Sequence, residues 1–244
     1  MPTKKVIPIK PVTSWSFTRY NDYKQCPFKF YNKHILKITE PPNAAMERGT
    51  KIHALAENYT KGIIKACPKE LSTFKAEFAD LRKMYKGNRN NMLVEDNWCF
   101  TAKWDDTDWR DWTNGWVRIK LDLSFQVEDT LHIVDNKTGK NSPYKNVEYD
   151  EQCELYALAG LLKYPHVVDA RPRLWYLDEG TVHPDDDNVK VYTQDDVPRL
   201  KKLWEMRVKP MFKDKSFKAT PNHGCQWCHY RKANAANGGG QCQY

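Results

Sequence analysis

The sequence predicts an α/β fold on two observations. Residues 119–137 alternate apolar and polar side chains with the period of two typical of half-buried strands, interrupted by a polar turn at 128–130. Three other stretches, 44–64, 150–164 and 197–211, place apolar residues three and four positions apart, as amphipathic helices do. The chain has 244 residues, of which 40% are hydrophobic, so it can bury a substantial core.

The overall charge fits a nucleic-acid partner. The chain carries 39 Lys and Arg against 31 Asp and Glu, a net charge of +8. Such a balance suits a polyanionic partner, although solvated Lys-rich faces give the same composition. The longest apolar runs fall short of the roughly 18 residues of a membrane helix, and residues 1–12 lack the apolar core of a secretory signal. We therefore expect a cytoplasmic protein without a membrane partner.

Two short helices are expected near the N-terminus. Ser16 can cap the first helix through its hydroxyl group, and aromatic residues follow at helical spacing. These are Phe17, Tyr20 and Tyr23. Pro27 breaks this helix directly after Cys26, and a second helix is expected at 28–36.

The helix at 44–64 combines an apolar stripe with a histidine. The stripe consists of Ile52, Leu55, Ala56, Tyr59 and Ile63. Gly49 and His53 lie one turn apart in the same helix. A single histidine on a helix is more often structural than a metal ligand, so the helix alone does not assign it a role. Residues 65–92, polar and rich in Lys, are expected to continue as helix.

A tryptophan-rich segment at 97–116 precedes the strands of the core. It contains Trp98, Trp104, Trp109, Trp112 and Trp116 among several aspartates. Aromatic side chains interleaved with charges can stack on nucleic-acid bases. The aspartates would repel a phosphate backbone, however, and tryptophan is usually largely buried. We therefore favour a β-hairpin that packs over the core.

The strand phase at 119–137 brings acidic and basic groups together. Asp135 and Lys137 share one face of the second strand, because alternate side chains point the same way. Asp122 would join them from the neighbouring strand. Two carboxylates and an ammonium group at a sheet edge can hold a hard divalent metal beside a phosphate. A solvated strand end is the plainer interpretation of the same residues.

Further elements follow this pair of strands. A basic loop is expected at 140–145, then the helix that begins near Asp150, and two more strands at 173–177 and 190–192. The helix buries the leucines Leu155, Leu158, Leu161 and Leu162. Gln152 and Tyr156, four positions apart, share another face of it.

The C-terminal cysteines predict a metal centre. Seven cysteines, an odd number, argue against a fully paired disulfide framework. Cys225 and Cys228 can reach one metal, and Cys242 follows a Gly-rich span. Three thiolates need a fourth ligand to complete a tetrahedral zinc site or a four-iron cluster. His223 or His229 is a candidate for that position.

The motifs together resemble a known family. Asp122, followed on the next strand by the run 135–139 (DNKTG), is similar to the D…(D/E)-x-K-T-G core of the PD-(D/E)XK nucleases. More narrowly, it resembles the RecB-type branch, which includes the CRISPR adaptation nucleases and many phage exonucleases. Gly49 and His53 match the G-x-x-x-H element of that branch. The resemblance covers the chain from about Ser14 to its end.

The resemblance implies a fold and an activity. The expected fold is a restriction-endonuclease-like core, a central mixed β-sheet flanked by helices, forming one domain over 1–244. The expected activity is metal-dependent hydrolysis of DNA phosphodiester bonds by an exonuclease of DNA recombination, repair or processing. Its substrate would be single-stranded DNA or duplex ends. A helicase or recombinase is the kind of protein partner such an enzyme would have, and a phage or prokaryote its kind of source.

The resemblance also implies residue roles. The catalytic residues would be Asp122, Asp135, Lys137 and Gln152. The ligands of Mg²⁺ or Mn²⁺ would be His53, Asp122, Asp135 and the main-chain carbonyl of Asn136. Lys137 would orient the attacking water and stabilise the anionic transition state. Gln152 and Tyr156 match the Q-x-x-x-Y motif, whose two residues contact DNA. Glu95 matches an acidic position at the start of the family's sheet, and we assign it no role.

Iron–sulfur members of this family supply a fourth cysteine ligand. In many of them one cysteine precedes the nuclease core and three follow it. By that resemblance Cys26 would join the cysteines of 225–242 around a [4Fe–4S] cluster, with Zn²⁺ the less favoured occupant, and tie the chain ends together. The gap between Cys228 and Cys242 is longer than in relatives. Two other departures are Lys120-Leu121 in place of a glycine and Asp rather than Glu as the second acid.

Two alternatives remain open at this point. A non-catalytic nucleic-acid-binding scaffold could use the cysteines as a structural zinc clip. Within enzymes, a structure-specific endonuclease could carry the same core. The presence of Asp122, Asp135 and Lys137 together favours an enzyme, because a scaffold does not need all three.

Overall fold

The computed structural model describes residues 10–142, 146–234 and 239–244, so part of the predicted basic loop at 140–145 lies outside the described residues. The chain divides into two compact units, and each is described by itself. One unit comprises Met1–Pro41 and Glu205–Tyr244, and the other Pro42–Trp204. None of the helices in the described ranges has the length and apolar character needed to cross a bilayer.

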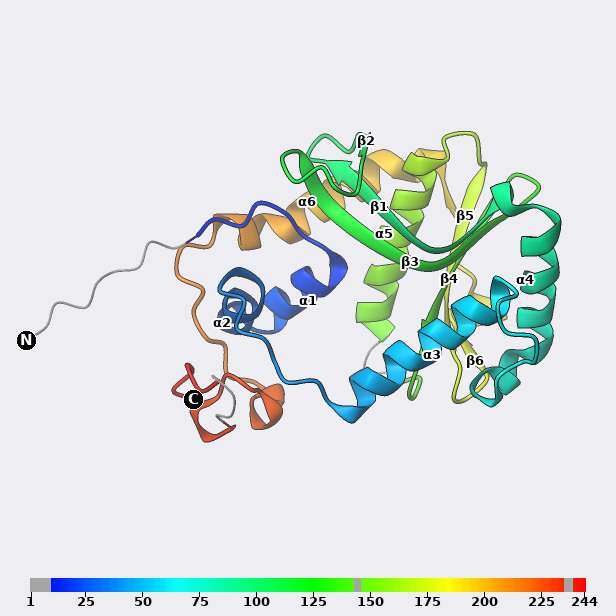
Figure 1. Ribbon diagram of the computed structural model, residues 1–244. Coiled ribbons are helices and arrows are strands. Elements are labelled where there is room, and N and C mark those ends of the chain that lie inside the picture. Colours follow the sequence, from blue (N-terminus) through cyan, green and yellow to red (C-terminus); the bar gives the residue numbers. More distant parts are fainter. Residues whose placement is uncertain (1–9, 143–145, 235–238) are drawn as a thin grey trace, which may run out of the picture. The chain divides into compact units, whose positions relative to one another are not determined.

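The larger unit, Pro42–Trp204, is built on a seven-stranded sheet (Figure 1). Its strands are β1 (Met92–Thr101), β2 (Asp106–Thr107), β3 (Gly115–Val127), β4 (Thr130–Lys137), β5 (Asp169–Tyr176), β6 (Thr181–His183) and β7 (Tyr192–Thr193). They run in the order β2-β1-β3-β4-β5-β6, and β7 also pairs with β5. β4 and β5 are parallel, whereas the other pairs are antiparallel. The predicted mixed sheet is confirmed.

Strands β3 and β4 form the hairpin that the alternating pattern predicts. In β3 the apolar residues Val117, Ile119, Leu121 and Leu123 are buried. The hairpin register pairs Leu123 with Val134 and Ser124 with Ile133. The next positions in that register are Asp122 on β3 and Asp135 on β4, and both belong to the same face of the sheet.

Helices cover both faces of this sheet. They are α3 (Ala44–Thr60), α4 (Lys75–Gly87) and α5 (Asn146–Lys163), with α6 (Val197–Lys213) beginning in this unit. α5 connects the parallel strands β4 and β5, as a parallel pair requires. Gly160 lets α5 lie close to β4, because a Cβ there would stand 2.5 Å from Leu131. On the other face α3 and α4 bury an apolar cluster with the sheet, which includes Ile52, Phe78, Leu123, Val134 and Trp175.

Predicted boundaries differ from the structure at several places. The helix expected over 65–92 is not continuous, since a 3₁₀-helix spans Lys69–Phe74 and α4 spans only Lys75–Gly87. α3 ends at Thr60, so Ile63 is 67% exposed and does not extend the apolar stripe. The strand expected at 190–192 begins only at Tyr192. Strand β6 has three residues and was not predicted, because so short a segment shows no clear period.

The tryptophan-rich segment packs mainly into the fold. Trp98 and Trp104 are buried, at 1% and 4% exposure, which confirms the packing hypothesis for these two side chains. Trp112 is 74% exposed. The guanidinium of Arg118 lies 4.4 Å from the ring centre of Trp112 and donates hydrogen bonds to three backbone carbonyls of the hairpin.

The smaller unit joins the N-terminal helices to the C-terminal segment. It contains α1 (Phe17–Gln25), α2 (Pro27–Phe30) and one turn of π-helix, Tyr31–Ile35. The Ser16 hydroxyl accepts a hydrogen bond from the Arg19 N–H at 3.3 Å, so the predicted cap is confirmed. Several long-range hydrogen bonds link the chain ends; for example, Asn222 donates to the Gln25 carbonyl, and Tyr230 to the Ile38 carbonyl.

Within the part of the chain that the structure describes, the four cysteines predicted to form one centre are not clustered. Cys26, Cys225, Cys228 and Cys242 lie in the smaller unit as free thiols. Among the described residues, the one set of three or more His, Cys, Asp or Glu ligand atoms within 4.8 Å of one another contains no cysteine. Backbone N–H groups contact two of the sulfurs. The Thr220 N–H donates to Cys26 at 3.5 Å, and the Asn222 N–H to Cys225 at 3.3 Å.

Candidate active site

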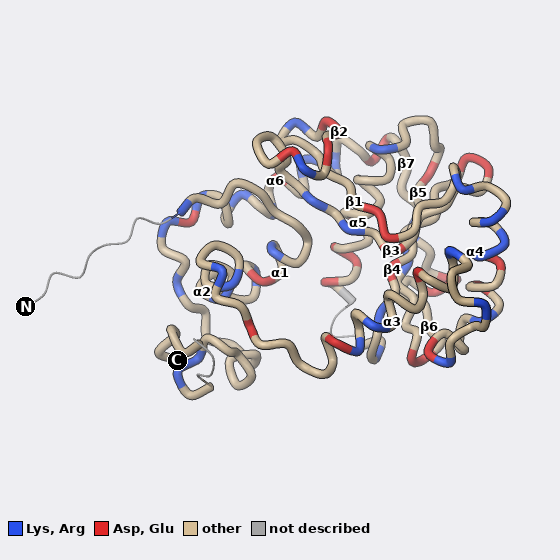
Figure 2. Tube along the Cα trace, viewed as in Figure 1, with Lys and Arg blue, Asp and Glu red and all other residues tan. Residues whose placement is uncertain are grey.

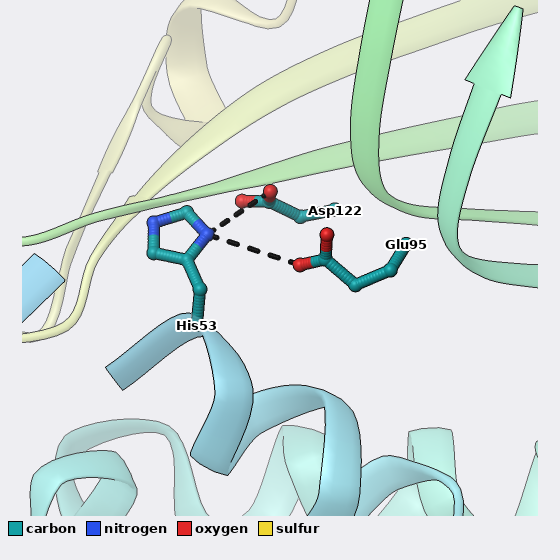
Figure 3. A group of neighbouring side chains, drawn as sticks. All are labelled: His53, Glu95 and Asp122. Atoms are coloured by element: carbon teal, nitrogen blue, oxygen red, sulfur yellow. Dashed lines mark hydrogen bonds and ion pairs between the residues drawn. The ribbon is translucent and has the colours of Figure 1, made fainter. Parts of the chain in front are cut away.

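Three elements of the larger unit bring an imidazole and two carboxylates together (Figure 3). His53 comes from α3, Glu95 from β1 and Asp122 from β3. The Nδ1 atom of His53 lies 3.1 Å from Asp122 Oδ1 and 4.0 Å from Glu95 Oε1. α3 is close to the end of β4, since a Cβ at Gly49 would lie 3.4 Å from Thr138 Oγ1. The helix can therefore present His53 to the strands.

The environment of His53 favours its protonated form. Its hydrogen bond to Asp122 raises the pKa of the imidazole, and the charges of Asp122, Asp135 and Glu95 act in the same direction. Burial opposes this shift without cancelling it. His53 thus holds a proton more firmly than a free histidine does, at a place surrounded by carboxylates.

Asp122 is the most enclosed member of the three. Its side chain is 14% exposed, against 32% for His53 and for Glu95. One carboxylate oxygen accepts the backbone N–H of Asn136 at 2.6 Å. Burial and the charge of Asp135 raise the pKa of Asp122, although the bond to His53 opposes this. A carboxylate in such a place gains stability from a nearby cation.

Asp135 belongs to a closed ring of polar contacts beside this group. The ring consists of three hydrogen bonds and one ion pair. Lys137 Nζ lies 2.6 Å from Asp135 Oδ2 and donates to Gln152 Oε1 at 3.0 Å. Gln152 Nε2 donates to the Tyr156 hydroxyl at 2.7 Å. The Tyr156 hydroxyl in turn donates to Asp135 Oδ1 at 2.6 Å. Because the tyrosine oxygen already accepts from Gln152, its proton is directed to Asp135.

The ring holds its members in definite charge states. Burial lowers the pKa of Lys137, but the charge of Asp135 and its contact with the amine, together with the charges of Asp122 and Tyr149, outweigh burial and raise it, so the amine stays protonated. Burial and the charge of Asp135 raise the pKa of Tyr156 well above its ordinary value, which keeps the phenol neutral. The ring therefore presents an ammonium group next to a carboxylate at the end of β4.

The structure brings the sequence-predicted residues to one region of the larger unit. His53, Asp122, Asp135, Asn136, Lys137, Gln152 and Tyr156 all lie there. Within it, the contacts of Asp135 are with Lys137, Gln152 and Tyr156. Gln152 and Tyr156, assigned to DNA contact by resemblance, are 8% and 4% exposed and bond to site residues. Their DNA role stays a prediction.

Glu95 is the member of the site to which the sequence gave no role. Its position opposite Asp122 follows from the register of β1 and β3, in which Val94 pairs with Leu123 and Asp96 with Leu121. That register depends on contacts between strands far apart in the sequence, and no local pattern in β1 indicates it. The sequence signal that could have pointed to Glu95 was its acidic side chain.

The donor set suits a divalent metal ion. Among the described residues, the ligand atoms of His53, Glu95 and Asp122 all lie within 4.8 Å of one another. Figure 2 shows acidic segments of β1, β3 and β4 near one another in the larger unit. Carboxylate oxygens suit Mg²⁺ and Mn²⁺, and an imidazole extends the choice to softer transition metals. The residues present therefore fit the metal that a PD-(D/E)XK core uses.

Comparison with known proteins places the chain in a family. The family model described as the PD-(D/E)XK nuclease superfamily matches residues 14–233. No curated protein matched the chain. Solved structures with a similar backbone include a protein of Eubacterium rectale described provisionally as an exonuclease, at 12% identity and a TM-score of 0.49, covering 90% of this chain and 88% of that one. Another is SSO0001, at 13% identity and a TM-score of 0.37, covering 91% and 86%.

Both TM-scores lie below 0.5, so the family assignment rests on the family model. That model spans most of the chain and includes every residue of the site described above. Membership implies a nucleic-acid substrate. The chain belongs to the PD-(D/E)XK nuclease superfamily.

Proposed function

We propose that this protein is a metal-dependent DNA nuclease of the RecB-type branch that acts as an exonuclease in DNA recombination, repair or processing. The observation that carries the proposal is the convergence of His53 and Asp122 beside the Asp135–Lys137 pair. A scaffold protein has no use for a protonated lysine held against a buried carboxylate next to a metal-fitting group. The order of motifs along the chain supports the RecB-type branch.

Each residue of the site has a role in the proposed hydrolysis. His53, Asp122, Asp135 and the main-chain carbonyl of Asn136 would hold Mg²⁺ or Mn²⁺. Such an ion, when bound, lowers the pKa of a water molecule and neutralises charge on the phosphate. Lys137, which stays protonated, orients that water and stabilises the anionic transition state. Gln152 keeps the lysine amine in place through its carbonyl oxygen.

Residues 1–244 are proposed to act as one nuclease domain. The family model runs across the boundary between the two units, from residue 14 to residue 233. The smaller unit then serves the same activity as the sheet. The rival in which both units form a non-catalytic scaffold predicts DNA binding without cleavage.

The iron–sulfur cofactor is proposed on narrower grounds. Its support is the pattern of one early and three late cysteines, together with the place of all four in the smaller unit. In a cubane cluster each sulfur binds a different iron, so the ligand sulfurs stand farther apart than around a single ion. No step of the proposed hydrolysis involves this centre.

The experiment for the proposed function uses three DNA substrates. Purified protein is incubated with Mn²⁺ and end-labelled single-stranded DNA, end-labelled duplex DNA or closed circular duplex. An exonuclease degrades a linear substrate and leaves the circle intact. If the circle is cleaved, the protein is a structure-specific endonuclease and the exonuclease proposal is rejected. Binding to all three substrates without cleavage, in Mn²⁺ and in Mg²⁺, would reject the enzyme.

A further inference from the structure

The group of His53, Glu95 and Asp122 forms without Asp135. The three side chains come from α3, β1 and β3, and their ligand atoms lie within 4.8 Å of one another. Figure 3 shows the Glu95 carboxylate directed toward His53 and Asp122. One imidazole and two carboxylates converging from separate elements make a set of donors for a single divalent ion.

The backbone of Glu95 is unusual for a strand. Its φ angle is +54°, although the pairs on either side, Val94 with Leu123 and Asp96 with Leu121, are regular. A residue other than glycine pays about 1 kcal/mol or more for this left-handed conformation. In this conformation the carboxylate of Glu95 lies beside that of Asp122. Two neighbouring carboxylates repel each other unless a cation is present. Both costs are offset if Glu95 binds a metal.

Asp135 is occupied elsewhere. Its Oδ2 atom lies 2.6 Å from the Lys137 amine, and its Oδ1 atom accepts the Tyr156 hydroxyl at 2.6 Å. Gln152 Nε2 is a third neighbour, at 3.4 Å from Oδ1. The Tyr156 hydroxyl and the Lys137 amine thus each contact one oxygen of Asp135, although Oδ2 accepts no hydrogen bond from the described residues and meets Lys137 as an ion pair. To bind the same ion, Asp135 would have to give up at least one strong, charge-assisted contact.

We propose that Glu95 is a metal ligand and that, in the absence of DNA, His53, Glu95 and Asp122 hold the ion while Asp135 stays with Lys137 and Tyr156. This rests on the proposed metal-dependent nuclease function and changes the ligand set implied by family resemblance. Glu95 supplies the second carboxylate in the resting enzyme. Asp135 is kept available for the stage at which DNA is bound.

The test measures Mn²⁺ binding by the full-length protein without DNA, from the loss of the free-ion signal in electron paramagnetic resonance. Glu95→Gln and Asp122→Asn should each weaken Mn²⁺ binding at least tenfold. Asp135→Asn should leave the dissociation constant within threefold of wild type. The matched control is Glu128→Gln, because Glu128 has the same φ of +54° but lies in the exposed β3–β4 turn. It should bind Mn²⁺ as wild type does.

Two results would overturn the inference. One is wild-type Mn²⁺ affinity in Glu95→Gln, and the other is a loss in Asp135→Asn as large as that in Asp122→Asn. Circular dichroism identifies a variant that fails to fold, and Glu95→Asp, which keeps the charge, then replaces Glu95→Gln with a smaller expected loss. If the wild type cleaves DNA in Mn²⁺ while either result holds, the nuclease function stands and this inference falls. If the wild type neither binds Mn²⁺ nor cleaves DNA, both the proposed nuclease function and this inference are rejected.

Discussion

At the scale of single residues, the Tyr156 hydroxyl is the clearest positioning group in the site. It is buried and donates to Asp135, so Tyr156→Phe removes one hydrogen bond to a charged partner, worth about 1.5–3 kcal/mol. If that support matters for the reaction, turnover falls roughly tenfold to a hundredfold. DNA affinity should stay within twofold, because the hydroxyl faces the interior.

The measurement for Tyr156→Phe separates positioning from DNA contact. Single-turnover cleavage in Mn²⁺ gives the rate, and fluorescence anisotropy in Ca²⁺ gives the DNA dissociation constant. Tyr85→Phe is the control, since Tyr85 is half-buried on α4 and takes no part in the ring. Weaker DNA binding with an unchanged rate would make Tyr156 a DNA contact, as family resemblance implies.

His53 leads to a prediction about pH. Its hydrogen bond to Asp122 raises the pKa of the imidazole above the ordinary value of about 6.5, so the protonated form persists to a higher pH than in a free histidine. Only the neutral imidazole binds a metal, and the proton must leave first. Mn²⁺ affinity should therefore rise with pH through the neutral range and level off above the raised pKa.

Calorimetry can count that proton. Mn²⁺ is titrated at one pH in two buffers of different ionisation enthalpy, and the difference in heat gives the protons released. His53→Gln should abolish most of the release, whereas His166→Gln, at an exposed histidine that contacts Gln126, should not change it. Equal release from wild type and His53→Gln would contradict the assignment of His53 as a ligand.

The sequence predicted most of these residues because strand and helix periods place them. Asp122, Asp135 and Lys137 follow from the alternation in 119–137, and Gln152 from its helical spacing. The partner of Asp135 could not be predicted, since it depends on how deeply α5 lies against β4. The position of the Glu95 carboxylate depends on a left-handed backbone conformation inside a strand. Glutamate has no local preference for that conformation.

At the scale of elements, the contact between α5 and β4 sets the geometry of the ring. Gly160→Ala would put a Cβ at 2.5 Å from Leu131 and 3.0 Å from Ile133, so the helix or these side chains must shift. Overpacking of this kind costs about 1–3 kcal/mol. Because α5 also carries Gln152 and Tyr156, we expect reduced cleavage together with a lower midpoint of thermal unfolding.

Gly87→Ala is the matched control for this change. Gly87 is the last residue of α4, and a Cβ there would meet nothing within 4 Å. Alanine should therefore be neutral or slightly stabilising at this position. Differential scanning fluorimetry and the cleavage assay compare the two variants. Equal behaviour of Gly160→Ala and Gly87→Ala would show that the α5–β4 contact tolerates a larger separation.

Elements with several turns or residues were predictable, and short ones were not. The helices at 44–64, 150–164 and 197–211 all form, because their apolar stripes repeat at helical spacing over several turns. Strands β6 and β7 have three and two residues, too few to show a period. They form because β5 offers a strand edge for pairing, which is a property of the folded sheet.

At the scale of the whole molecule, the cysteines test how the chain ends are joined. If they bind a cubane cluster, protein purified without oxygen is brown and holds about four irons per chain. Ser at Cys26 or Cys225 should then remove the colour and lower stability, because metal binding contributes to folding. Ser at Cys67 is the control and should leave the colour unchanged. Colourless wild-type protein with one zinc, or with no metal, would reject the cluster.

The distances between cysteines far apart in the chain could not be predicted from the sequence. Spacing identifies Cys225 and Cys228 as neighbours, but the distance from them to Cys26 depends on how two segments nearly two hundred residues apart pack together. Closing so long a loop costs entropy that local patterns do not record. In the structure, hydrogen bonds make this connection, such as those from Asn222 to the Gln25 carbonyl and from the Thr220 N–H to the Cys26 sulfur.

The most direct test of the central claim compares cleavage of linear end-labelled DNA by the wild type and by Asp122→Ala, Asp135→Ala and Lys137→Ala in Mn²⁺. The account predicts rapid cleavage by the wild type and background cleavage by each variant. All four proteins should bind DNA alike, because phosphate contacts are spread over many Lys and Arg side chains. A folded variant, free of contaminating nuclease, that cuts at the wild-type rate would contradict the account.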